Sequence, residues 1–435
     1  MKQNKILLSA LALMISISHV SLAQELLTLE NAIAITLKEN HSVQVARNNS
    51  EISENNAHLG GAGLLPRIDI ISSANYSDNE VQTGFGAATD SYTTTTAAIQ
   101  ASYNLFDGFG SVYRYKKLNS LNESGQLRAR NQIELSIVEV SDVYFAVAEA
   151  SENLKLNSES LEISRQRLER AQNRSQYGQT NTIELLSAEV DFNTDSVSYV
   201  NAQLALDQAK RELNVLLNRD VNTDFQVNFE VEFAQNLNLA NLQVNAAKNN
   251  AAYLLTTKNT QQSEFDLKIA NSAYLPQLDF QTSYGYNQTK DQWGMTLNDP
   301  NRNFTVGLNL SFNLFNGFQN SVNKQNAHIQ LKNERILQDE ALLNLQSNVA
   351  NKYQAYQNSL FVLNVQQKNL EPAQLNFNRT KELYELGQVT TTQFREAQLN
   401  LILAKNNILS AKYNAKINEI QLLRLSGELV TTNEI

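Results

Sequence analysis

The sequence contains no cysteine and very little proline or glycine. Among 435 residues there are no cysteines, 4 prolines and 15 glycines. The lack of cysteine excludes a disulfide framework, a thiolate metal site and lipid attachment to an N-terminal cysteine. Scarce proline and glycine indicate long uninterrupted elements, whose boundaries the few such residues mark.

The sequence also lacks an excess of positive charge and any pattern of metal ligands. The formal net charge is −9, which argues against a nucleic-acid partner. His41, His58 and His328 have no metal-ligand partner three or four residues further on. "GFGSVY" from Gly108 lacks the third glycine of a dinucleotide-binding loop. We therefore expect neither an enzyme nor a cofactor-binding or metal-binding protein.

The one long apolar run lies at the N-terminus. Lys2 and Lys5 precede an apolar stretch from Ile6 to Val20, and small residues follow it. This pattern predicts a signal peptide over residues 1–23 that is cleaved on export. No apolar run of about 18 residues follows, so no transmembrane helix is expected.

The sequence is a tandem repeat. "NLFDGFGSV" from Asn104 returns as "NLFNGFQNS" from Asn313, and "LLPRIDIISSANY" from Leu64 answers to "YLPQLDFQTSYGY" from Tyr274. The offset stays at 209 or 210 positions, which indicates one duplicated unit.

Between each proline and each "NLF", apolar and polar residues alternate. The first repeat places Ile68, Ile70 and Tyr76 on one parity, and the second places Phe304, Val306 and Leu308 there. We predict four strands of roughly 10 to 14 residues, paired as two hairpins. Their polar loops are expected at Asp78 to Thr93 and at Lys290 to Arg302.

Such alternation also fits a soluble sheet with one wet face. The secretory segment, the strand length and the aromatics at the strand ends favour a lipid-facing band with an interfacial girdle. The aromatics in question are Phe106, Phe109, Phe315 and Phe318.

After each hairpin the period changes to that of a helix. From Ile133 to Leu168, stripe positions recur at steps of four and three, which predicts a long packed helix over Ser111 to Tyr177. The chain then turns at Gly178 and returns as a second helix. The second repeat does the same around Gly387, with Pro372 expected to kink or break its outgoing helix. "DFQVNFEVEF" from Asp224 predicts a short isolated strand.

Four strands cannot close a membrane barrel, so the barrel must be shared between chains. Two chains supply eight strands, and side chains fill the interior of an eight-stranded barrel. Three chains supply twelve strands and leave a lumen. The polar parity of the strands favours the water-filled lumen and hence three chains.

These motifs together resemble the TolC-type outer-membrane channel family over essentially the whole mature chain. The resemblance rests on the Leu-Pro strand entries at Pro66 and Pro276, the NLF/G strand exits at Gly108 and Gly317, and a turn glycine followed six residues on by an acid, Gly178 and Glu184. It implies a mixed, mainly α-helical fold in which a trimeric outer-membrane β-barrel continues into a long periplasmic α-helical barrel.

The expected segments follow the repeat. They are the signal peptide at 1–23, an N-terminal helix at 24–65, a β-hairpin at 66–107, a long helical hairpin at 108–218, an equatorial segment with a short strand at 219–236, a helix at 237–275, a second β-hairpin at 276–315, a second helical hairpin at 316–426 and a tail at 427–435.

The resemblance implies a passive exit duct for efflux or type I secretion. Its partners would be two further copies of the chain, a periplasmic adaptor, an inner-membrane pump and outer-membrane lipid. The alternative is a structural coiled-coil protein of the envelope, either a periplasmic adaptor or a surface adhesin. The two alternating hairpins argue against an adaptor.

The resemblance also places a gate at the periplasmic tip, beside the turn glycines. Glu184 and Tyr384 match the pair that closes the family's channel, while Val389 stands where the family has a basic residue. Gln393 and Glu396 match the acidic ring positions, so at most one ring survives from this pair. The bland alternatives are an ordinary solvated acid for Glu184 and simple turn glycines for Gly178 and Gly387.

An arginine cluster lies in the first long helix. Arg165, Arg167, Arg170 and Arg174 interleave with Glu162 and Glu169. This pattern favours a solvated helix face over an anion site.

Overall fold

The computed structural model describes residues 26–84, 86–177, 182–234, 236–291, 295–297 and 301–430. The expected signal peptide and Gly178 lie outside these residues. The chain divides into two compact units. The first, called here the hairpin unit, contains Glu134–Leu237 and Asn351–Leu423 with the chain up to Gln44. The second, called the sheet unit, contains Val45–Ile133 and Asn238–Ala350 with the chain from Arg424.

The elements repeat in the same order in both halves of the chain. The first half contains β1 (Leu26–Leu27), α2 (Leu29–Glu39), α3 (His41–Asn56), β2 (Arg67–Thr83), β3 (Gly86–Phe106), α4 (Gly110–Gln176) and α5 (Thr182–Leu216). The second contains β4 (Gln226–Val227), α6 (Leu239–Asn249), α7 (Ala251–Ser272), β5 (Gln277–Asp291), β6 (Asn301–Ser311), α8 (Gln319–Glu385) and α9 (Thr391–Ser426). The prediction of a mixed, mainly helical fold with two hairpins of strands is confirmed.

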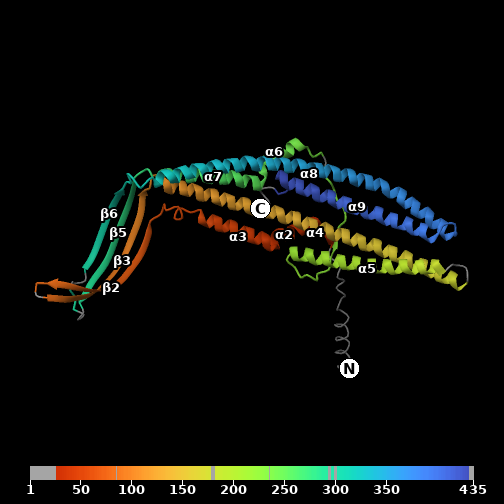
Figure 1. Ribbon diagram of the computed structural model, residues 1–435, viewed down its shortest axis with the longest axis horizontal. Coiled ribbons are helices and arrows are strands. Elements are labelled where there is room, and N and C mark those ends of the chain that lie inside the picture. Colours follow the sequence, from red (N-terminus) through yellow and green to blue (C-terminus); the bar gives the residue numbers. More distant parts are fainter. Residues whose placement is uncertain are drawn as a thin grey trace, which may run out of the picture. The chain divides into compact units, whose positions relative to one another are not determined.

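The four long strands of the sheet unit form one antiparallel sheet in the order β2-β3-β5-β6. Figure 1 shows them side by side and curved. Pairing in the first hairpin continues from Arg67↔Ser102 to Thr83↔Gly86, so the loop expected at Asp78 to Thr93 is mostly strand. The β-branched run Thr93 to Thr96 and the bond from Ser91 Oγ to Asp78 Oδ1 (2.7 Å) support this longer pairing.

Each predicted first helix is two helices that meet at an asparagine. Asn40 ends α2, and its side-chain Oδ1 accepts hydrogen bonds from the backbone N–H groups of Ser42 and Val43 in α3. Asn250 ends α6 in the same way and caps α7 through Tyr253 N–H. The extended backbone at each asparagine breaks the helix, and its side chain satisfies the freed donors.

The long helix α8 runs through Pro372 without interruption. The predicted break is therefore wrong, whereas the alternative, a kink at Pro372, stays a prediction. Pro372 and Lys368 are both exposed, so the carbonyl that loses its partner faces water, which lowers the cost of the proline.

The predicted isolated strand from Asp224 is also wrong. Only Gln226–Val227 is strand, and it pairs in parallel with Leu26–Leu27. The following backbone is held by side chains of the hairpin unit: Lys412 Nζ donates to Phe229 O (2.9 Å) and Lys416 Nζ to Glu232 O (2.7 Å). These bonds replace the missing ladder.

The heptad stripe of α4 is buried from Ile133 to Val147 and then changes face. Beyond Leu156, the buried positions are Ser160, Ser164, Arg167 and Ala171, whereas Arg165 is exposed. The prediction that the whole arginine cluster is solvated therefore fails at Arg167. The shift occurs because polar residues of α5 and α9 bind this face, as described below.

Among the described residues, none of the helices is both long and apolar enough to cross a membrane.

Candidate channel surfaces

The sheet places most of its apolar side chains on one face and most of its polar side chains on the other. Cross-strand neighbours on one face are apolar, as in Ile70↔Ile99↔Tyr284↔Phe304. Ile70 is 80% exposed and Phe304 71% exposed. An exposed apolar face of this extent marks contact with lipid or protein.

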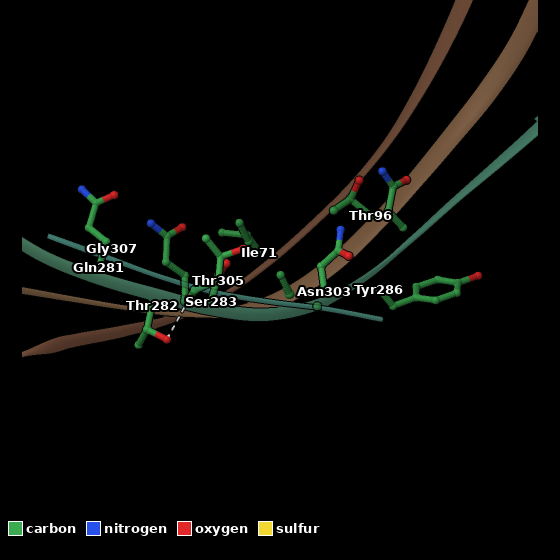
Figure 2. Close-up of a pocket in the computed structure, with 13 residues that line it drawn as sticks. Ile71, Thr96, Gln281, Thr282, Ser283, Tyr286, Asn303, Thr305 and Gly307 are labelled. Carbon is green, nitrogen blue, oxygen red and sulfur yellow. Dashed lines mark hydrogen bonds between the residues drawn. The ribbon is translucent and has the colours of Figure 1, made fainter. Parts of the chain in front are cut away.

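The opposite face is polar and hollow. Gln100, Ser283 and Thr305 lie opposite one another across β3, β5 and β6. They line a hollow of about 400 Å³, and Figure 2 shows Gln281 and Asn303 on this side of the sheet while Thr282 points to the other. Glycine and alanine at Gly285, Gly307 and Ala98 keep the hollow open. Most of the side chains in the hollow are small or neutral and polar, as expected for a surface that faces water.

The joint between strand and helix is the same in both repeats. Gly108 and Phe109 both adopt positive φ (69° and 68°), as do Gly317 and Phe318 (66° and 65°). The consecutive left-handed residues turn the chain sharply into the long helix. Asp107 caps α4 through Ser111 N–H (2.7 Å).

The four aromatics form two matching pairs. The rings of Phe106 and Phe109 meet edge-on at 5.2 Å, and those of Phe315 and Phe318 meet edge-on at 5.3 Å. Phe109, Phe315 and Phe318 are exposed. Pro66 and Pro276 directly precede β2 and β5. The interfacial role of the aromatics stays a prediction, with a geometry that suits it.

At the tip, the turn at Gly387 closes α8 by a Schellman motif. Gly387 has φ 75°, Gln388 N–H donates to Leu383 O (2.9 Å), and Gly387 N–H donates to Tyr384 O (3.1 Å). Thr390 and Gln393 then form a capping box at the start of α9, because Gln393 N–H donates to Thr390 Oγ1 and Thr390 N–H donates to Gln393 Oε1. Gln393 therefore serves its own helix.

Glu184 lies in the first turn of α5, where a carboxylate is favoured. Its Oε1 lies 3.5 Å from Arg174 Nη1 and accepts from Thr391 Oγ1 at 3.4 Å. Glu184 thus connects the first helical hairpin to the start of α9. Glu396 is exposed in the first turns of α9.

Tyr384 is buried in an aromatic cluster. Its ring stacks on Phe394 at 4.8 Å, and Phe377 and Leu401 complete the core. Val389 packs against this cluster, so the position where the resemblance would place a basic residue makes an apolar contact instead. The gate roles of Glu184 and Tyr384 stay predictions.

Sequence reasoning missed a buried ion network between the two helical hairpins. Arg395 of α9 binds Asp195 of α5 by two bonds (2.6 and 2.8 Å), and Ser160 of α4 donates to Asp195 Oδ2 (3.0 Å). Arg167 binds Asp191 (2.9 Å). Burial lowers the pKa of Arg395, but the hydrogen bond and charge of Asp195 outweigh it, so the pKa is raised overall.

No three histidine, aspartate or glutamate side chains in the described part of the chain gather where they could hold a metal ion.

Comparison with known proteins relates this chain to a protein family. The outer membrane efflux protein family matches residues 32–219 and 242–428, one stretch per repeat. The "Probable outer membrane lipoprotein SilC" of Salmonella typhimurium is 22% identical over 416 residues, which cover 91% of this chain and 84% of that protein. The "Outer membrane protein TolC" of Escherichia coli K12 is 21% identical over 383 residues, which cover 84% of this chain and 75% of that protein.

Solved structures share the fold. The crystal structure of the Campylobacter jejuni CmeC outer membrane channel superposes with a TM-score of 0.79 at 16% identity, over 94% of this chain and 87% of that chain.

Proposed function

The chain belongs to the outer membrane efflux protein family, and from that premise we propose that it forms the outer-membrane exit duct of a tripartite efflux or type I secretion system. The observation that carries the proposal is the four-stranded sheet with an exposed apolar face and a hollow polar face. This sheet is joined twice, by identical turns, to a helix of 67 residues. A structural envelope protein needs no such sheet.

The sheet edges support a trimer. Within the described residues, β2 and β6 each pair on one side only, whereas β3 of the first repeat pairs with β5 of the second. If β6 pairs with β2 of the next copy in the same way, the contact is head to tail and closes into a ring. Three copies then give a closed sheet of twelve strands with a water-filled lumen.

The partners and the cargo are part of this proposal. The exposed helix ends at the tip, around Gly387, are the surface we assign to a periplasmic adaptor, with an inner-membrane pump supplying the energy. Several relatives carry "Cation efflux system protein CusC" as their name. We propose that the duct transports its cargo without binding it through soft sulfur ligands, because the chain has no cysteine and only 3 methionines.

The duct is tested by fractionation, mild-detergent sizing and planar bilayers. We expect a trimer in the outer-membrane fraction that forms steady pores. A soluble periplasmic monomer without conductance would overturn the proposal.

The gate is tested on the same pores. Glu184→Ala removes the contacts of that carboxylate to Arg174 and Thr391, so single-channel conductance should rise. Glu162→Ala, which alters an exposed pair further up α4, is the control. Unchanged conductance in Glu184→Ala would remove that residue from the gate while leaving the duct intact.

A further inference from the structure

Arg167 is a buried arginine with unused hydrogen-bond donors. Its side chain is 3% exposed, and Nη2 donates to Asp191 Oδ2 at 2.9 Å. Nε and Nη1 are buried and have no hydrogen-bond partner among the residues the structure describes. Buried donors on a charged group are costly to leave unpaired, so an unseen ligand is expected beside them.

The nearby carboxylates are already committed. Asp191 lies 3.7 Å from Arg395 Nε as well as binding Arg167, and Asp195 binds Arg395 twice. Two arginines and two aspartates therefore balance one another, and neither aspartate is shown to reach Nε or Nη1 of Arg167.

A cavity of about 50 Å³ adjoins Arg167 between α4, α8 and α9. Three cationic side chains line it, Arg167, Arg170 and Lys381, against one carboxylate, Glu385. The guanidinium of Arg170 lies on the Tyr384 ring at 5.6 Å, which holds its charge at the wall. The volume is sufficient for one small ion or a few waters.

We propose that this cavity binds a halide ion, chloride in the cell, against Arg167 with Arg170 and Lys381 around it. The cationic groups offer only donors, which a spherical anion accepts from every side. A water molecule could donate to Glu385, but it brings no charge to offset the three cations. The ion joins α4 of the first helical hairpin to α8 and α9 of the second. This inference is independent of the proposed function.

Bromide, which scatters anomalously, locates the site directly. In crystals grown or soaked in sodium bromide, we expect an anomalous peak within hydrogen-bond distance of Arg167 Nε or Nη1. A cavity that holds only ordered water at saturating bromide would overturn the proposal.

Heat unfolding in chloride against gluconate at equal ionic strength tests the site in solution. The unfolding temperature of the wild type should be higher in chloride. Lys381→Gln keeps the Arg167–Asp191 pair but should raise the chloride concentration for half-saturation about tenfold, because it removes one hydrogen bond from a charged donor. Arg165→Gln, at an exposed arginine paired with Glu162, should keep the wild-type dependence. Identical chloride dependence in the wild type and Lys381→Gln would contradict the assignment.

Discussion

The two repeats are alike where helices join and different at the tip. Asn40 Nδ2 donates to Leu216 O (2.9 Å) in the first repeat, and Asn250 Nδ2 donates to Leu425 O (3.1 Å) in the second. Each asparagine thus holds a helix junction against the end of the returning helix. Both halves keep this contact because both build the same stretch of wall.

The tip follows the opposite rule. Arg395 binds Asp195, but the positions 209 residues away are Leu186 and Ala404. Among the described residues, the ion network therefore occurs once. It joins unlike parts of the two hairpins, so the repeats have become complementary there and have stopped being equivalent.

The largest expected effect breaks the contact that is present once. Arg395→Leu leaves Asp195, 7% exposed, without its main partner and should lower the free energy of unfolding by about 3–5 kcal/mol. Lys405→Leu, at the exposed pair with Glu159, should cost less than about 1 kcal/mol. Denaturant unfolding measures both. If Arg395→Leu cost no more than Lys405→Leu, the network would have no role in stability.

A second pair of variants compares the two strand–helix joints. A Cβ on Gly108 would lie 2.5 Å from Ser272 O, whereas one on Gly317 has no other described residue within 4 Å. Both alanines strain a positive φ by about 1–3 kcal/mol, and Gly108→Ala adds a clash with backbone. We expect Gly108→Ala to reduce the yield of folded chain more strongly. If the repeats are equivalent in the trimer, Gly317→Ala should mainly reduce trimer yield on detergent sizing. Equal loss of folded chain in both variants would contradict the expected difference between the two joints.

Two tyrosines sharpen the likeness between repeats. Tyr144 OH donates to Leu27 O (2.9 Å), and Tyr353 OH donates to Leu237 O (3.3 Å), at equivalent positions. Tyr144 is fully buried and its hydroxyl also accepts from Asn228 N–H (3.0 Å), so Tyr144→Phe should cost about 1–3 kcal/mol. Tyr353→Phe loses a longer, half-buried bond and should cost less in the same unfolding assay. The reverse order would contradict this account of the equatorial segment.

The smallest effect at neutral pH concerns Tyr413. Its hydroxyl is buried with no partner among the described residues, so Tyr413→Phe should leave stability at pH 7 nearly unchanged. Burial, then Glu152 and Glu149, raise the pKa of Tyr413 above the ordinary value of 10.0. The folded chain keeps this proton when the unfolded chain loses it, so stability falls as pH rises above 10. Tyr413→Phe should show a smaller alkaline loss, and an unchanged pH profile would contradict the direction of the shift.

The sequence predicted the features that depend on local spacing. Pro66, the NLF strand exits and the period of two located the four strands. They could do so because alternation indicates which side chains share one face of a strand. The constant repeat offset likewise predicted that the two strand–helix joints, at Gly108 and Gly317, are equivalent. The Thr390-x-x-Gln393 capping box also depends on local spacing alone.

The buried network was not predictable in this way. The network joins three helices that are far apart in sequence, through Ser160, Arg167, Asp195 and Arg395. The heptad spacing predicted Arg165, and not Arg167, on the packed stripe of α4. The clue was a run of serines at helical spacing, Ser160 and Ser164, followed by Arg167. A polar stripe gains meaning only once its partners are known, because buried charges are tolerated only in pairs.

We propose that each chain supplies two equivalent β-hairpins to the barrel and that neighbouring chains repeat the contact between these hairpins. Within the chain, Ile99 of β3 lies opposite Tyr284 of β5. The repeat offsets map this pair onto Leu308 of one chain and Ala74 of the next. The chain has no cysteine, so Leu308→Cys with Ala74→Cys gives a clean crosslink.

After oxidation in outer membranes, denaturing gels should show covalent dimers and trimers for Leu308→Cys with Ala74→Cys. Leu308→Cys with Ile68→Cys should give none, because six residues of strand shift the partner by about 20 Å. Within one chain, β2 and β6 are separated by two strands, so an internal crosslink cannot mimic the result. Covalent trimers from the first pair alone are the predicted result, and no crosslink or equal crosslinking of both pairs would contradict the account.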